Sequence, residues 1–331
     1  MRLTRRLLDF RAHHRLANMP FSPRWTMLLT AALGAGCSAP VVDDIADASG
    51  GTTEGIVLVE RVVTGEGAAQ TNVSAKFMRL GSGANVELAE RIVGAHLDLP
   101  PTGQCMTVPT GDVDEKRLTR AALGSIELID VGDVTMRPLA ALGAIPAADT
   151  PSMPLAARAF PDVGDLVSGV FYTSRDAQSD LPAGVTYAVE GTGSTLVDRF
   201  SIEADAPLAP ADVRIGDALL REGVVIPEGA PTAVRWQAPP AASRGRYLMD
   251  LVIIDVRGEG QPAVRCAFRD EGEAVLPAAA LRTTSSGAGS AATIAFHRIR
   301  RRVFAASGVD SGELRFDLSV IGRATLAPRA P

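Results

Sequence analysis

The feature that most constrains the fold is a period-two alternation of apolar and polar residues in short segments. In ELRFDLSVIG (313–322), apolar residues alternate with Arg315, Asp317 and Ser319, and NVSAKF (72–77) shows the same pattern. Successive side chains of a β-strand point to opposite faces of the sheet. Each segment is therefore predicted to pack one face into a core and expose the other to water.

Further segments of strand character lie on both sides of an Ala- and Pro-rich stretch (140–161), which we interpret as a long connection or linker. They are GIVLVERVV (55–63), SIELI (125–129), DRFSIEA (198–204), TAVRWQAP (232–239), RYLMDLVIIDV (246–256), PAVRCAFRD (262–270) and ATIAFHRIRRRVF (292–304). Long amphipathic helical patterns are scarce. The predicted fold class is therefore all-β.

The predicted architecture is two β-sandwich domains, with a boundary at the Pro-rich segment ADAPLAPAD (204–212). The N-terminal sandwich comprises residues 55–206 and the C-terminal sandwich residues 207–331. Short strands around one core tryptophan, Trp236, favour an immunoglobulin-like arrangement for the second domain. In VLPAAAL (275–281), a proline followed by alanines predicts one short helical turn.

An apolar run without charge ends in small residues and a cysteine in LLTAALGAGCSAP (28–40). This segment resembles the bacterial lipobox, although Gly34 stands where that motif prefers leucine. In lipobox proteins the cysteine sulfur receives a diacylglycerol and the chain is cut just before it. The resemblance implies a lipoprotein signal peptide at residues 1–36 and lipidation of Cys37. The small and acidic residues of 37–54 then predict a flexible tether.

Four short motifs carry a wider resemblance. They are GAGCS (34–38), SAKFMRL (74–80), Val-Arg-Trp (234–236) and a C-x-F…VLPAAAL module (266–281). On these motifs the chain resembles a family of uncharacterised lipoproteins common in myxobacteria and their relatives. The resemblance implies a β-sandwich body on an outer envelope membrane and no known activity. Cys37 is the only residue whose role it carries over.

Charge limits the predicted partners. Removal of residues 1–36 takes the chain from 33 basic and 38 acidic residues to 27 and 37, a net charge of −10. Nucleic acids and anionic lipid surfaces favour clustered positive charge, so neither is predicted as the main partner. The predicted contacts are the membrane, through the lipid anchor, and an envelope protein or glycan. Ser38 favours the outer membrane, by analogy with enteric lipoproteins.

The two cysteines beyond Cys37 allow two interpretations. An exported protein lies in an oxidising compartment, where Cys105 and Cys266 are candidates for a disulfide. Sequence spacing alone does not bring two cysteines together. Cys266 alternates with Val264 and Phe268, so a buried free thiol is the alternative.

Motifs for catalysis or metal binding are weak. Only His96 and His297 follow Cys37, which excludes a three-histidine zinc site, and we interpret His297 as a solvated or edge histidine. Neither a G-x-S-x-G nor an S-x-x-K motif occurs. The acidic turns DVGD (130–133 and 162–165) and GDVDE (111–115) favour turns for conformational reasons and lack a calcium-loop pattern. No cofactor, metal or catalytic residue is predicted.

One dense basic patch stands out in the second domain. Arg298, Arg300, Arg301 and Arg302 are candidates for contact with an anionic polymer such as lipopolysaccharide or an acidic glycan. The alternative is structural, because charges on an edge strand discourage aggregation between sheets.

These observations predict a lipid-anchored protein of the cell envelope, of non-catalytic interaction or structural type. A glycan-binding surface module is the first alternative, and it would need exposed aromatic side chains. A secreted hydrolase with paired carboxylates is the second, because such pairs are assembled in space rather than in sequence.

Overall fold

The alternating segments form β-strands, and the protein is almost entirely β. A computed structural model describes residues 51–65, 67, 69–108, 126–139, 152–161, 167–174, 181–240, 250–282 and 289–328. The described residues all belong to one compact unit of the chain, residues 47–331. The predicted signal peptide (1–36), Cys37 and the predicted tether up to residue 50 lie outside the described residues. The predicted end of the tether at residue 54 is wrong, because Thr52–Glu54 already belong to a strand that pairs within the sheet.

The strands are short except for four. They are β1 (Thr52–Thr64), β2 (Ala69–Leu80), β3 (Cys105–Thr107), β4 (Ile126–Leu128), β5 (Val134–Pro138), β6 (Met153–Ala159), β7 (Val167–Ser174), β8 (Thr186–Gly191), β9 (Phe200–Asp205), β10 (Arg214–Ile215), β11 (Ala218–Leu219), β12 (Val224–Pro227), β13 (Thr232–Arg235), β14 (Leu251–Gly258), β15 (Val264–Arg269), β16 (Glu273–Leu276), β17 (Ser290–Ala306) and β18 (Val309–Ala327). The helical elements are α1 (Val86–Ile92) and two 3-10 turns, η2 (Leu220–Glu222) and η3 (Ala278–Leu281).

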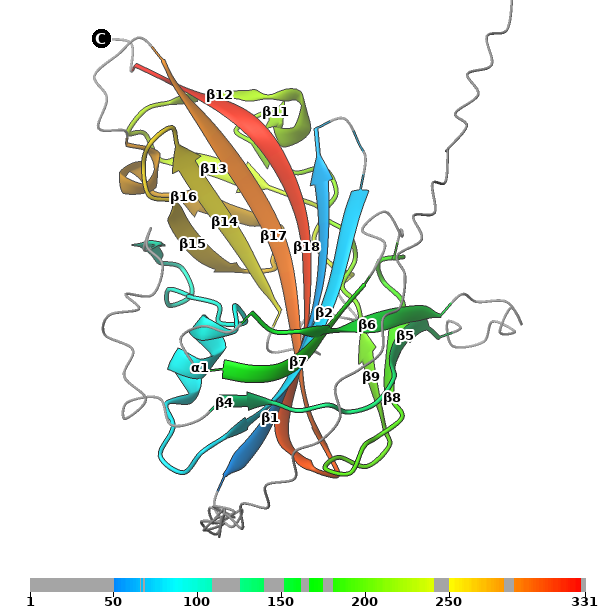
Figure 1. The fold of residues 1–331 in the computed structure, drawn as a ribbon. Helices are drawn as coiled ribbons and strands as arrows, with labels where there is room; N and C mark the ends of the chain where they lie inside the picture. The colour runs from blue at the N-terminus through cyan, green and yellow to red at the C-terminus, as the bar shows by residue number, and fades with distance from the viewer. Residues whose placement is uncertain are drawn as a thin grey trace, which may run out of the picture. The chain divides into compact units, whose positions relative to one another are not determined.

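Most strands belong to one 14-stranded sheet. Its order is β3-β15-β14-β17-β18-β1-β2-β4-β7-β6-β5-β8-β9, and β12 also pairs with β18. The hairpin of β17 and β18 contains the two longest strands of this sheet, and both run the length of the described unit (Figure 1). β1 lies parallel to β18, from Glu54 opposite Ser311 to Thr64 opposite Ile321.

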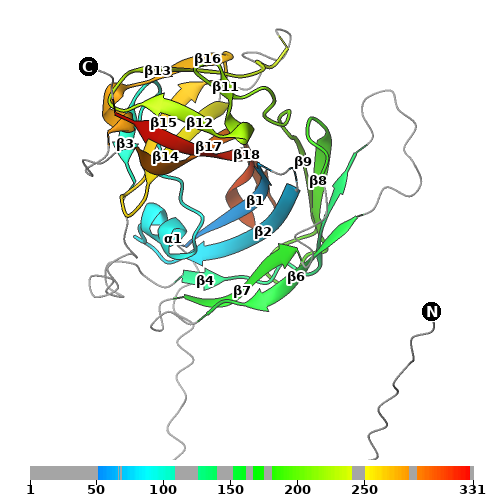
Figure 2. The ribbon, with the colours of Figure 1, turned by 90° about the horizontal axis from the view of Figure 1, so that it is seen from above.

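The large sheet curls, so that β9 approaches the far half of β17. The backbone N–H of Asp198 donates to the carbonyl oxygen of Ser307 at 3.3 Å, and Arg300 Nη1 donates to the Asp205 carbonyl oxygen at 3.4 Å. Seen from above, β1, β2, β7, β6, β8 and β9 follow one another around a closed path (Figure 2). The first hydrophobic core contains residues of these strands and of β18, among them Phe77, Tyr172 and Phe316.

A second sheet has four strands, in the order β11-β10-β13-β16. It shares a hydrophobic core with the start of β17 and the end of β18. The second hydrophobic core contains residues of both sheets, among them Val234, Ile254 and Phe296. Trp236 is buried in this core, as predicted, and its ring lies 5.2 Å from that of Phe296. The indole N–H donates to Asp270 Oδ1 at 2.7 Å, which satisfies its polar group inside the core.

The predicted boundary at residues 206/207 separates the cores but does not interrupt the sheet. Apart from the tip of the β17–β18 hairpin, the first core is built from residues before 207, and the second mostly from residues after it. Parallel pairing of β1 with β18 nevertheless crosses the boundary. The immunoglobulin-like arrangement of residues 207–331 stays a prediction.

Two local predictions have different outcomes. The helical turn predicted in 275–281 is confirmed, because η3 follows Pro277 at Ala278–Leu281. The interpretation of 140–161 as a connection is wrong for its last third, where β6 pairs with β5 and β7. Alanine and proline have weak strand propensity, so only the pairing with these neighbours identifies the strand.

Candidate functional site

The candidate site is a charged face of the large sheet that lies beneath another part of the chain. Residues of β14, β15, β17 and β18 share this face, because they lie opposite one another or two apart in the strand register. We call it the charged face, and its members are Asp255, Arg265, His297, Arg301, Glu313, Arg315 and Asp317. The cover begins with α1 and continues as residues 94–108, which we call the strap.

The strap begins where α1 ends. The side chain of Asn85 caps the first turn of α1 by accepting a backbone N–H bond at 3.1 Å. Gly94 then adopts a positive φ of 67°, which favours glycine. The backbone N–H groups of Ala95 and His96 both donate to the carbonyl oxygen of Glu90, at 2.7 and 3.1 Å. These bonds turn the chain out of the helix and across the sheet.

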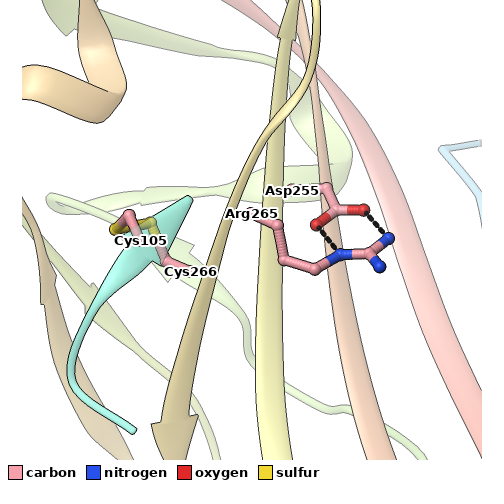
Figure 3. The surroundings of a disulfide bond; sticks show 4 residues. All are labelled: Cys105, Asp255, Arg265 and Cys266. Carbon is pink, nitrogen blue, oxygen red and sulfur yellow. Dashed lines mark hydrogen bonds and ion pairs between the residues drawn. A yellow bond between two sulfur atoms is a disulfide. The ribbon is translucent and has the colours of Figure 1, made fainter. Parts of the chain in front are cut away.

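The far end of the strap is fastened to the sheet edge. Gly103, with a φ of 83°, donates its N–H to the Ala267 carbonyl oxygen at 2.7 Å, and Ala267 donates to that of Gln104 at 3.1 Å. β3 then pairs with β15, and a disulfide joins Cys105 to Cys266 (Figure 3). Of the two interpretations of these cysteines, the structure therefore shows the disulfide.

The middle of the strap is held by two guanidinium groups of the charged face. Arg315 Nη1 donates to the carbonyl oxygen of Ala95 at 2.9 Å, and Arg265 Nη1 donates to that of Asp98 at 3.1 Å. Both bonds end on backbone oxygens of the strap. These two arginines therefore hold the backbone of the strap in place, whatever side chains it carries at Ala95 and Asp98.

His297 and Asp317 form an ion pair on the charged face. Nδ1 of His297 lies 2.9 and 3.1 Å from the two oxygens of Asp317, and each side chain is about four-fifths buried. Burial by itself lowers the pKa of His297. The hydrogen bond to Asp317 and the charges of Asp317 and Asp255 outweigh burial, so that the pKa of His297 lies above its ordinary value. The interpretation of His297 as a solvated or edge histidine is therefore wrong.

Arg265 and Asp255 form a two-pronged pair beside it. Nε and Nη2 of Arg265 donate to the two Asp255 oxygens at 2.9 and 2.7 Å. Figure 3 shows that Arg265 and its neighbour Cys266 point to opposite sides of the sheet. One strand thus carries the ion pair on the charged face and the disulfide on the side of the second core.

Glu313 lies between two arginines of the same face. It accepts from Arg301 Nε at 2.7 Å and from Arg315 Nε at 2.6 Å. Burial by itself raises the pKa of Glu313. The hydrogen bond to Arg301 and the positive charges of Arg301 and Arg315 outweigh burial, so the pKa of Glu313 lies below its ordinary value. Glu313 is therefore an ionised partner for both guanidinium groups.

A second set of charges belongs to the cover itself. Arg91 of α1 donates through Nη1 to Asp98 of the strap at 3.0 Å, and this bond is the main cause that lowers the pKa of Asp98. Nδ1 of His96 lies 3.3 Å from Glu90 Oε2, and Nε2 lies 3.4 Å from Asp98 Oδ1. These contacts fold the strap back onto α1.

A cavity of about 110 Å³ remains between strap and sheet. Its floor comprises Leu58, Glu60, Arg315 and Asp317, and its wall is the strap at 94–97. A volume of this size holds a few water molecules. The cavity is therefore small, lined by both polar and apolar residues, and partly enclosed by the strap.

Lys76 lies on β2, which β1 separates from β18 in the large sheet, and is only 9% exposed. Burial lowers the pKa of Lys76, and the charge of Glu60 opposes that shift only in part. The alternation in NVSAKF predicted that Ser74 and Lys76 meet water, and this is wrong, because both faces of β2 are covered. The same holds for Arg315 and Ser319 of β18, which were predicted to face outward.

The charged face does not assemble a nucleophile. Ser319 lies opposite His297 in the β17–β18 register, next to Asp317 on the same face. Its hydroxyl donates to the Arg61 carbonyl oxygen at 3.4 Å, and the residue is 2% exposed. Among the described residues, no group of three or more His, Cys, Asp or Glu side chains is arranged to hold a metal ion.

The predicted basic patch is contradicted for Arg298 and Arg300, which are 2% and 8% exposed. Arg298 contacts Asp270 and donates to the carbonyl oxygens of Leu208, Ala209 and Gln237 at 3.1, 3.4 and 2.7 Å. The guanidinium groups of Arg298 and Arg300 both donate to acceptors inside the protein, so neither arginine contacts an anionic polymer.

Arg300 completes this arrangement. It binds Asp250 at 2.6 to 3.2 Å and donates to the carbonyl oxygens of Asp205 and Ala206. The two arginines therefore fasten the predicted boundary segment 204–212, whose prolines lack N–H groups for sheet pairing. The structural alternative of an edge strand is wrong for Arg298, which β14 and β18 flank on both sides. The pairing of β17 with β14 ends at Ile299, before the other three arginines.

The remaining predicted residues have mixed outcomes. Arg301 is bound to Glu313, whereas Arg302 is exposed. In the first DVGD turn, Asp130 Oδ1 accepts from the Tyr172 hydroxyl at 2.6 Å and from the Gly132 N–H at 2.8 Å, which is a structural role. The turns at 162–165 and 111–115 lie outside the described residues.

The comparisons with known proteins are negative. No protein-family model matches the sequence, and no curated protein matches it significantly. Within the part of the chain that the structure describes, no helix is both long and apolar enough to cross a membrane.

Proposed function

We propose that the protein is exported, lipid-anchored through Cys37 and held at the cell envelope, where its all-β body serves a non-catalytic interaction or structural role. The proposal places the body on the outer membrane, on the basis of Ser38 next to the anchor. It is supported by the lipobox resemblance in the sequence and by two features of the structure.

The observation that carries the proposal is the disulfide between Cys105 and Cys266, which joins strands 161 residues apart in sequence. Disulfides persist in oxidising compartments outside the cytosol. The pairing supports export. It also takes up both other cysteines of the chain and leaves Cys37 for acylation.

The second supporting feature is the way charges are matched. On the charged face, Asp255, Glu313 and Asp317 each have a basic partner within 2.9 Å. Matched pairs of this kind fix the arrangement of strands and hold the strap, which favours a structural role over catalysis.

The glycan-binding alternative lacks its expected feature. Sugar platforms use exposed aromatic rings, and the aromatic side chains of the described residues are all buried or half-buried. Trp236 is turned into the second core. No observation therefore favours this alternative.

Detergent partition in the native host tests the proposal. The wild-type protein is expected in the detergent phase of solubilised membranes, and a Cys37→Ser variant in the aqueous phase or as uncut precursor. Ser38→Ala serves as the matched control, because it changes the neighbouring residue and leaves the acylated sulfur intact. Recovery of the wild type in the aqueous phase, or of processed Cys37→Ser in the detergent phase, would overturn the lipid anchor.

A further inference from the structure

The strap is attached to the sheet very unevenly along its length. Its far end has backbone bonds and a covalent link, at Gly103 and Cys105. Its middle is held to the sheet by two side-chain donors, Arg315 and Arg265, and by burial of Ala95 in a third hydrophobic cluster. Breakage of the covalent link would therefore leave only backbone hydrogen bonds to β15 and its flank, among the described residues, to fasten the far end of the strap.

Two glycines in unconfined surroundings bound the middle of the strap. They are Gly94 and Gly103, and each adopts a positive φ with no atom within 4 Å of the position a Cβ would take. Open space around two glycines permits large backbone rotations at both ends of the segment.

What lies under the strap differs from an ordinary core. Buried charges are costly and are commonly replaceable by apolar residues without loss of stability. The strap nevertheless covers three sets of ion pairs, centred on Asp255, Glu313 and Asp317, and a cavity of about 110 Å³. The charged face is therefore suited to a conformation in which the strap has moved away and the face contacts water or a polar ligand.

We propose that the strap is a redox-controlled lid over the charged face, closed while Cys105 and Cys266 are joined and open once they are reduced. A dithiol reductant supplies two electrons and two protons. The S–S bond breaks, two cysteine thiols form, and the reductant becomes a disulfide. Cys105 is half-buried on β3, the last strand of the large sheet within the described ranges, so the reductant approaches from that end of the sheet.

The lid goes beyond the proposed function and does not depend on the lipid anchor. It predicts that reduction exposes the charged face while both hydrophobic cores persist. The first core and the β17–β18 hairpin contain no cysteine, so their amides report whether the body stays folded.

Amide hydrogen exchange followed by mass spectrometry or NMR tests the lid in the full chain, with and without a dithiol reductant. Reduction is expected to accelerate exchange at Gly103 and Val108, whose N–H groups bond to β15 and its flank, by about tenfold or more. Exchange at Phe296 and Phe316 is expected to stay unchanged. The double variant Cys105→Ser/Cys266→Ser should reproduce the reduced pattern without reductant.

Two results would overturn the lid. Unchanged exchange at Gly103 and Val108 after reduction would mean that the disulfide does not hold the strap closed. Equal acceleration at Phe296 and Phe316 would mean that reduction unfolds the whole body, and the disulfide would then be purely structural.

Discussion

Arg298 and Asp270 form an ion pair beside Trp236 of the second hydrophobic core, with side chains only 3% and 4% exposed. Arg298 Nη2 donates to Asp270 Oδ1 at 3.1 Å, and Nε lies 2.7 Å from Oδ2 without hydrogen-bond geometry. The same Oδ1 accepts from the indole of Trp236. This pair therefore connects β17, the boundary segment and the second core.

Truncation of Arg298 should be strongly destabilising. Arg298→Met leaves the Asp270 carboxylate buried and unpaired, which costs about 3–5 kcal/mol of unfolding free energy. Urea unfolding of the purified protein measures the loss. Arg302→Met is the matched control, because Arg302 lies on the same strand and is exposed. Equal stability of the two variants would show that the buried pair does not hold the boundary segment.

Loss of the disulfide should lower stability without abolishing the fold. Cys266→Ser breaks a link across 161 residues, and removal of a native disulfide typically costs about 2–5 kcal/mol. Non-reducing peptide mapping should recover Cys105 and Cys266 in one linked peptide from the wild type. Two free thiols in the native protein would contradict the pairing.

The His297–Asp317 pair should make stability depend on pH. Because the folded pKa of His297 lies above its ordinary value of 6.5, its contribution is fully present below that value. The contribution is lost as the pH rises through the folded pKa. The stability difference between wild type and Asp317→Asn should therefore be largest below pH 6.5 and shrink as the pH rises above that value.

Imidazole titration by NMR gives the independent check on this sign. The midpoint for His297 should lie above 6.5 in the wild type and fall in Asp317→Asn. A wild-type midpoint at or below 6.5 would show that burial, rather than Asp317, dominates this site.

Thr71 offers a prediction in the opposite direction. Its hydroxyl is buried, with 1% exposure, and has no hydrogen-bond partner among the described residues. Thr71→Val keeps the side-chain shape and removes the unsatisfied group, so it should stabilise the fold by about 1 kcal/mol. A destabilisation of similar size in urea unfolding would indicate that the hydroxyl has a partner in solution.

The alternating segments were sufficient to predict most strands and the all-β class. In ELRFDLSVIG, the apolar residues Leu314 and Phe316 are core residues, as predicted. The period of two distinguishes the faces of a strand but does not say what covers the polar face. The strap covers it here, and nothing in residues 94–100 signals that role.

Long-range pairing explains the other differences. The parallel pairing of β1 with β18 joins residues more than 250 positions apart, and strand pattern alone does not choose partners at that distance. The clustering of Arg298 and Arg300 resembled a surface patch. Their burial depends on the carbonyl oxygens of 205–209, which only the folded chain brings to them.

Mass spectrometry of the N-terminal peptide from native membranes decides whether the body is exported and anchored through Cys37. We expect a peptide that begins at Cys37 and carries the added mass of acyl chains. A peptide that begins at another residue and carries no lipid would contradict the anchor and would mean that the body is not held at the envelope in this way.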